Sequence, residues 1–235
     1  REACAALVLR GLTTAIARIT AHEEPLALGA VTRQFFDALS HVWPDATLRR
    51  AMADVASGDP ARVATGERTL SGTPSMNAVL RNGISPTLIS GGTRSNVIPT
   101  EAEATLNIRT LPGDSIEDVI ERMRAVVGDP NVSFRVRASG DDAPESPIDS
   151  PMYRAIVDSV AALDGRIRTV PYLSTGATDS ATLRKAGIPC YGILPFPLTQ
   201  EDEDRMHGHD ERVSLDALGF GVRLVHGIVQ RMTRV

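Results

Sequence analysis

The residues best suited to chemistry stand in the segment MHGHDERV near the carboxyl end of the chain. It places His207, His209, Asp210 and Glu211 in a short stretch before a predicted helix. Imidazole and carboxylate groups are ligands that zinc and similar divalent ions accept. A solvated, charged loop has the same composition, so the spacing alone leaves both interpretations open. The other histidines occur within helical patterns and are expected to be surface or packing residues: His22, His41 and His226.

A second candidate is the segment STGATDSATLRKAGIP, residues 174–189. Small residues between a predicted strand and a predicted helix, here around Gly176 and Thr178, expose backbone N–H groups that can hold a carboxylate or an oxyanion. The alternative is an ordinary strand-to-helix turn in which Thr178 or Asp179 caps the helix. The segment has no Gly-x-Ser-x-Gly elbow and Ser174 has no evident base, which argues against a serine nucleophile.

The third candidate is the segment GGTRSNVIPTEAEATLNIR, residues 91–109. Arg109 is predicted to project from the polar face of a strand, where it could bind a substrate carboxylate through two nitrogens. A solvated arginine on a sheet face is the alternative. Asn96 lies in a predicted turn and is by itself an ordinary turn residue.

Hydrophobic periodicity predicts the elements that must position these residues. Apolar positions at helical spacing predict helices over residues 2–22, 31–41, 46–56, 152–163, 179–186 and 214–232, and one that begins after Asp114 or Ser115. Alternating or short apolar runs predict strands over residues 87–92, 100–111, 132–136, 168–172 and 188–194. Gly58 and Pro60 interrupt the pattern, so residues 57–75 are expected to be rich in loops.

The order of these elements predicts two domains, residues 1–142 and 143–235. The first has the order of a split βαβ (ferredoxin-like) sandwich that lacks its first strand. The second alternates strands and helices, as an α/β sheet does. The fold class expected is therefore α+β and α/β, with a linker at residues 140–151. Because the chain begins at Arg1, without an initiator methionine and inside a helical pattern, we expect it to be a fragment.

The composition excludes several classes of protein. With 42% hydrophobic and 23% charged residues, the 235-residue chain has ordinary globular composition. A net charge of −4 provides no basic surface for nucleic acid. No apolar run approaches the roughly 20 residues of a membrane span. Only two cysteines are present, which favours a cytoplasmic location over a disulfide framework.

In their order along the chain, the three segments resemble metallopeptidase family 20. This family is the group of aminoacylase, glutamate carboxypeptidase, Gly-Xaa carboxypeptidase and succinyl-diaminopimelate desuccinylase. LRNGISPTLISGGTRSNVIPTEAEATLNIRTLPGD resembles the lid domain of the family. GATDSATLRKAGIPCYGI resembles the strand–loop–helix that lines its active site, and MHGHDERV resembles its terminal metal motif. The resemblance covers nearly the whole chain, from about Arg1 to Met232.

The resemblance implies a two-zinc catalytic domain interrupted by a lid, or dimerisation, domain of βαββαβ type. Residues 1–142 would be that lid, and residues 143–235 the C-terminal segment of the catalytic domain. The roles implied are metal ligand for His207, followed at the family spacing by Glu211 and Val213, and substrate binding for Asn96, Arg109, Gly176 and Thr178. His209 matches a variable position of the motif.

The activity implied is hydrolysis of N-acyl amino acids or small peptides with a free carboxylate. In such enzymes a glutamate acts as general base on water held between two Zn²⁺ ions. The general base, most metal ligands and the lid histidine are expected upstream of Arg1, so this chain alone is expected to be inactive and to retain no zinc. A homodimer through the lid is expected. The alternatives are a non-catalytic dimerisation module and a small-molecule-binding module.

Overall fold

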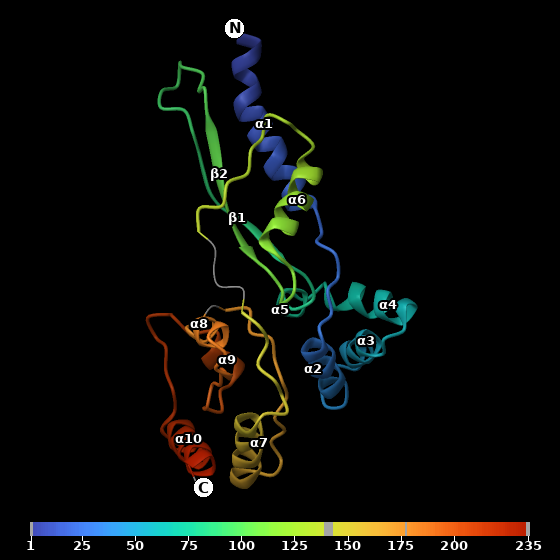
Figure 1. Cartoon of the computed structure of the whole chain (residues 1–235), viewed down its shortest axis with the longest axis vertical. Coiled ribbons are helices and arrows are strands. Elements are labelled where there is room, and N and C mark those ends of the chain that lie inside the picture. Colours follow the sequence, from blue (N-terminus) through green and yellow to red (C-terminus); the bar gives the residue numbers. More distant parts are fainter. Residues whose placement is uncertain (1, 139–142, 177, 234–235) are drawn as a thin grey trace. The chain divides into compact units, whose positions relative to one another are not determined.

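The computed structural model describes residues 2–138, 143–176 and 178–233 (Figure 1). The chain forms two compact units. Unit 1 consists of residues 1–144 and 172–177, and unit 2 of residues 145–171 and 178–235. The predicted domain boundary lies between residues 142 and 143, and the predicted linker begins at residue 140. Both involve residues outside those that the structure describes, so both remain predictions.

The sheet of unit 1 is an antiparallel pair of strands, β1 (Gly83–Gly91) and β2 (Ala102–Arg109). The register pairs Gly83 with Arg109 and Gly91 with Ala102, with an irregularity between Pro86 and Leu88. Side chains along β2 alternate between half-buried and exposed over most of its length, as the sequence predicts. One face of β2 therefore packs against the core and the other is polar, whereas Leu88 and Ile89 of β1 are exposed.

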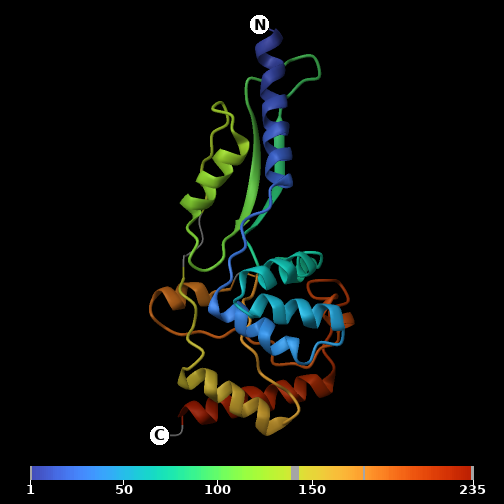
Figure 2. The same cartoon turned by 90° about the vertical axis from the view of Figure 1, so that its right-hand side faces the viewer.

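Two helices, α1 (Glu2–Ala21) and α6 (Ile116–Val127), cover the apolar face of this sheet (Figures 1 and 2). The helix α6 begins as predicted, because the Ser115 hydroxyl accepts a hydrogen bond from the Asp118 N–H at 3.1 Å. It ends at Gly128 in the left-handed conformation. The buried core residues of this layer are Ala15, Ile19, Val119, Met123 and Val127.

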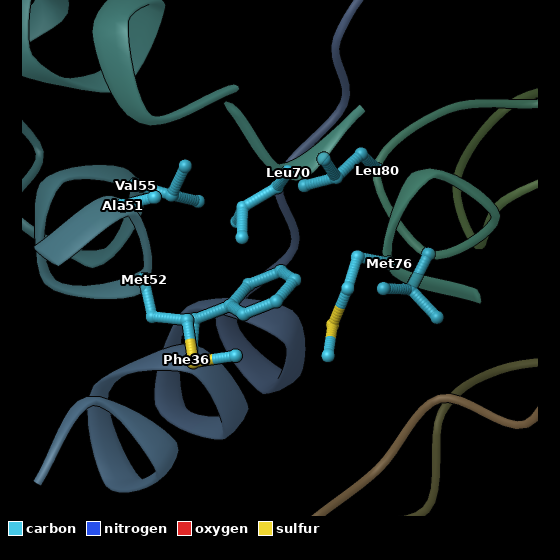
Figure 3. Close-up of a cluster of buried hydrophobic side chains, with 8 residues drawn as sticks. Phe36, Ala51, Met52, Val55, Leu70, Met76 and Leu80 are labelled. Atoms are coloured by element: carbon cyan, nitrogen blue, oxygen red, sulfur yellow. The ribbon is translucent and has the colours of Figure 1, made fainter. Parts of the chain in front are cut away.

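A helical bundle lies between α1 and β1 in the chain and has its own core (Figure 3). It consists of α2 (Ala30–Ser40), α3 (Ala46–Ala56), α4 (Pro60–Leu70) and α5 (Pro74–Asn77). Its buried residues are Phe36, Ala51, Met52, Val55, Leu70, Met76, Val79 and Leu80.

The prediction that residues 57–75 are rich in loops was wrong, because α4 occupies most of that stretch. The Asp59 carboxylate accepts hydrogen bonds from the N–H groups of Ala61 and Arg62 at 2.9 and 3.0 Å. Pro60 stands at the first helical position, where its missing N–H would have no partner within the helix in any case. Pro60, which the sequence predicts to interrupt the helical pattern together with Gly58, instead starts a helix that Asp59 caps.

Unit 2 is built on two helices, α7 (Pro151–Leu163) and α10 (Leu215–Thr233), which pack together. Their buried apolar residues form one cluster: Ala155, Ile156, Val160, Leu224 and Ile228. Two short helices, α8 (Ser180–Lys185) and α9 (Gln200–Glu203), stand in the loops between them. Of the described helices, none combines the length and apolar character that crossing a bilayer requires.

Three predicted strands, residues 132–136, 168–172 and 188–194, are not strands in the structure. In the described residues the sheet has two strands. Val132 and Phe134 nevertheless pack against the core of α1 and α6, as their alternation predicts, whereas Val136 of the same pattern is 46% exposed. A strand also needs a hydrogen-bonded neighbour, which alternation does not supply. The architecture, helices with a small antiparallel sheet, confirms the α+β class.

Candidate functional site

Arg109 stands at the last position of β2, on the polar face of the hairpin, and is exposed. Its Nε donates a hydrogen bond to the Asn107 side-chain oxygen at 3.1 Å. In the part of the chain that the structure describes, no carboxylate lies within ion-pair distance of its guanidinium. The terminal nitrogens are therefore free to bind the two oxygens of a ligand carboxylate.

A buried polar network stands directly behind the end of β2. The Asn82 side-chain oxygen accepts a hydrogen bond from the Leu111 N–H at 2.7 Å, which fixes the backbone two residues after Arg109. The Asn82 amide also donates to the carboxylates of Glu24 and Asp114. The Arg122 guanidinium contacts the same two carboxylates, at 2.9 and 2.6 Å. These groups thus hold the backbone of the turn that follows Arg109, at Leu111 and Asp114.

The charges of this network are held by their partners. Burial by itself raises the pKa of Glu24, but the hydrogen bonds from Arg122 and Asn82 outweigh it and hold that pKa below its ordinary value. The pKa of Asp114 is lowered for the same reason, against a similar effect of burial. No sequence motif predicts this network, because its members lie in four separate segments of the chain.

Asn96 lies in the loop between β1 and β2, in an open depression lined by Leu9 and residues 91–99. Arg109 is at the opposite end of the hairpin. Because β2 has eight residues, its ends are about 24 Å apart. One copy of the chain therefore does not bring Asn96 and Arg109 to the same small ligand, and the substrate role of Asn96 stays a prediction.

Gly176 belongs to the segment 172–177, which is part of unit 1. Its N–H donates a hydrogen bond to the Ser174 hydroxyl at 3.3 Å, which closes a short turn. Among the described residues other than its chain neighbours, the one atom that a Cβ added at Gly176 would meet within 4 Å is the Ser174 hydroxyl oxygen, at 3.6 Å. The backbone at this position is consequently open to a ligand.

Thr178 lies in unit 2, just before α8. Its carbonyl oxygen accepts a hydrogen bond from the Ala181 N–H at 3.3 Å. Asp179 occupies the N-cap position of α8 but makes no side-chain cap bond. The predicted capping role is therefore not fulfilled by Asp179, because its own backbone is already helical.

The loop around His207 follows α9, whose start is closed by a capping box between Thr199 and Asp202. His207 is exposed and has a φ of 65°, which is unusual for a residue with a side chain. Its N–H donates a hydrogen bond to the Glu211 carboxylate at 3.2 Å. Glu211 thus fixes the backbone of His207 through a hydrogen bond in which the imidazole ring takes no part.

Ion pairs brace this loop on both sides of His207. Arg205 pairs with Glu201 at 3.0 Å and with Asp210. Arg212 pairs with Asp202 at 2.9 Å. The hydrogen bond from Thr199 and that from Arg212 lower the pKa of Asp202 to about 2. The charged residues of this loop thus form ion pairs mainly with one another.

A metal site is not complete within the described residues. No three histidine, cysteine, aspartate or glutamate side chains come close enough to hold a metal ion there. The exposed imidazole of His207 has the chemistry of a zinc ligand, but a zinc ion bound to it would need further ligands. The predicted site residues are divided between the units: Asn96, Arg109 and Gly176 lie in unit 1, and Thr178 and His207 in unit 2.

The family known as the peptidase dimerisation domain of the M20 peptidases matches residues 9–135. This range includes α1 from residue 9 onward, all of α6, the helical bundle, both strands and Arg109. The chain belongs to the M20 peptidase family, and the predicted relation to metallopeptidase family 20 is confirmed.

Among similar proteins is the human N-fatty-acyl-amino acid synthase/hydrolase PM20D1. It is 31% identical over 160 residues, which make up 67% of this chain and 32% of that protein. Probable carboxypeptidase S-like 2 of Dictyostelium discoideum is 29% identical over 149 residues, 63% of this chain and 29% of that protein. The chain therefore spans about a third of the length of these relatives, which are hydrolases by name.

A solved structure with a similar fold is the M20 family metallo-carboxypeptidase Sso-CP2 from Sulfolobus solfataricus. The TM-score is 0.53 at 13% sequence identity, and the match covers 92% of this chain and 51% of that one. At this identity the likeness shows the fold alone. It agrees with the α+β architecture described above.

Proposed function

We propose that this chain is part of a zinc-dependent hydrolase that cleaves the amide or peptide bond of N-acyl amino acids or small peptides with a free carboxylate. Membership of the M20 family supports the reaction class. The names of the relatives, an N-fatty-acyl-amino acid synthase/hydrolase and a probable carboxypeptidase S-like protein, support the substrate class.

The observation that carries the proposal is the hydrogen bonding of the Arg109 guanidinium. The Arg109 Nε donates a hydrogen bond to the Asn107 side-chain oxygen, which leaves the two terminal nitrogens of the guanidinium for a carboxylate. Two parallel charge-assisted hydrogen bonds would both bind the substrate and fix its orientation. A lysine lacks this planar pair of donors. We therefore expect Arg109→Lys to raise KM for the substrate much more than it lowers kcat.

Within the proposed enzyme this chain supplies only part of the active centre. His207 would be one zinc ligand, and the other ligands and the general base would come from residues outside this chain. We therefore propose that the chain by itself is inactive. The residues that align make up only 32% and 29% of the two relatives, which is consistent with this division.

The test compares the chain with the product of the complete open reading frame that contains it. Bound zinc and hydrolysis of a panel of N-acyl amino acids and dipeptides are measured for both. We expect both properties in the complete protein and neither in residues 1–235. His207→Ala should lower turnover at least tenfold, as loss of a ligand does, and the matched variant His209→Ala should change it little. Hydrolysis by the isolated chain, or equal losses in the two variants, would contradict the proposal.

We also propose that two copies of the protein associate through the dimerisation domain. The support is the description of the family that matches residues 9–135. Light scattering of the purified complete protein should give twice the mass of one chain. A mass of one chain at micromolar concentration would contradict this.

A further inference from the structure

Phe35 of α2 contacts Tyr172, which belongs to the same segment as Gly176. The two ring centroids are 5.1 Å apart and the ring planes meet at 50°. Aromatic pairs attract one another at this separation. Although the two residues are far apart in the sequence, both are part of unit 1. The contact therefore joins the helical bundle to the segment 172–177.

The helical side of this contact is firmly held. Phe35 is half-buried and packs against the core of the bundle. Its ring is also 5.3 Å from the ring of Phe36, at 62°. Phe36 has no exposed surface and lies among the buried residues of the bundle core (Figure 3). Phe35 thus presents Tyr172 with an aromatic surface that is fixed in place.

The other side of the contact has little structure of its own. Residues 172–174 form neither helix nor strand, and Tyr172 is 53% exposed. In the described residues, a local hydrogen bond from the Gly176 N–H to the Ser174 hydroxyl closes the turn that follows. The contact with Phe35 supplies an anchor that this backbone does not provide.

We propose that the helical bundle positions the Ser174–Gly176 turn, with Phe35 as the positioning residue and Tyr172 as the side chain that it holds. This rests on the proposed function at one point, the contact of Gly176 with the carboxylate end of the substrate. Phe35 itself does not touch substrate. It raises the fraction of molecules in which the turn is in place, and a binding constant scales with that fraction.

The anchoring is tested on the chain itself by limited digestion with chymotrypsin. To cleave after Tyr172, the protease must take the tyrosine ring into its own pocket, which the pairing with Phe35 prevents. Phe35→Ala should speed cleavage of the bond between Tyr172 and Leu173 about 2- to 10-fold, which is the fold-change that the interaction energy of an aromatic pair corresponds to. Phe35→Tyr, which keeps a ring, should cleave at the wild-type rate.

Two internal controls accompany this digestion. Cleavage after Tyr191, which pairs with Tyr153 in unit 2, should not change. The emission of Trp43, which packs against the core of the bundle, should stay native and so show that the bundle is folded. Phe35→Leu serves as a second variant if alanine unfolds the bundle. An unchanged rate at Tyr172 in a folded variant without the ring would overturn the anchoring.

The positioning is tested by kinetics of the complete protein. Phe35→Ala should raise KM for the carboxylate substrate by a factor similar to that seen in the digestion, with kcat nearly unchanged, and Phe35→Tyr should restore KM. A loss confined to kcat would overturn the positioning role. A complete protein without hydrolase activity would contradict the proposed function instead, and the digestion would still decide whether Phe35 holds Tyr172.

Discussion

Arg122 and Glu24, 98 residues apart in the chain, form an ion pair in which Nη2 lies 2.9 Å from Oε2. The Glu24 side chain is 3% exposed and that of Arg122 is 30% exposed. The pair joins α6 to the segment between α1 and α2, behind the strand that ends at Arg109. A carboxylate this deeply buried depends on its partners, because the surrounding protein solvates charge poorly.

Removal of the cation should therefore destabilise unit 1. Arg122→Met leaves Glu24 buried without its arginine and should lower the free energy of unfolding by about 3 kcal/mol. The matched control on the same helix is Arg124→Met, which removes only an exposed pair with Glu121. That change should cost less than about 0.5 kcal/mol. Urea unfolding followed by Trp43 emission measures both, and equal costs would contradict this role of the network.

Stability should also depend on pH through the same carboxylates. The pKa values of Glu24 and Asp114 are lower in the folded chain than their ordinary values. The stability they contribute is therefore complete above their unfolded pKa values and is lost as the pH falls through the folded ones. We expect the free energy of unfolding to fall steadily below about pH 5.

The contribution of Glu24 can be isolated by a variant. Glu24→Gln should flatten this acid dependence, whereas Glu121→Gln, at an exposed position, should leave it as steep as in the wild type. The measurement is urea unfolding at a series of pH values from 7 to about 3. Parallel profiles for all three proteins would show that Glu24 is not the group responsible.

Gly66 allows α3 and α4 to approach closely. A Cβ atom at this position would overlap the carbonyl oxygen of Ala51 and lie 3.0 Å from the Asp54 Cβ. Gly66→Ala should therefore destabilise the bundle by about 2–3 kcal/mol. Gly72→Ala, where the nearest atom is the Thr69 carbonyl oxygen at 3.4 Å, should change stability by less than about 0.5 kcal/mol. Thermal unfolding of the two variants tests the difference.

The left-handed conformation of His207 predicts a stability gain when its side chain is removed. His207→Gly should stabilise unit 2 by about 1 kcal/mol, because glycine adopts a φ of 65° without steric cost. His209 does not have a positive φ, so His209→Gly should instead cost a few tenths of a kcal/mol or more. Far-UV circular dichroism in urea measures both. A stabilised His207→Gly variant that has lost zinc in the complete protein would agree with a functional origin of the strain.

Much of the local structure was predictable from the sequence. The helix Ala46–Ala56, the cap at Ser115 and the inward face of β2 all match expectation. These features depend on residues within a few positions of one another, so periodicity and capping chemistry are sufficient to predict them. The prediction was wrong at α4, where Gly58 and Pro60 indicate a break although Asp59 and Pro60 form the start of a helix.

The family was also predictable, because the three segments that resemble metallopeptidase family 20 occur in the expected order. The roles of the candidate residues Asn96, Arg109, Gly176, Thr178 and His207 are implied by that resemblance and remain predictions. Spacing along the chain did not reveal that Asn96 and Arg109 lie at opposite ends of one hairpin. That separation follows from the antiparallel register of β1 and β2.

The sequence alone therefore determined the chemical types of the candidate groups, most helices and the family. Only the tertiary structure decided which distant groups meet, such as Glu24 with Arg122 and Phe35 with Tyr172. The physical reason is that a helix or a cap is stabilised by neighbours in the chain. A buried ion pair or an aromatic contact between segments depends instead on the path of the whole backbone, which no local pattern specifies.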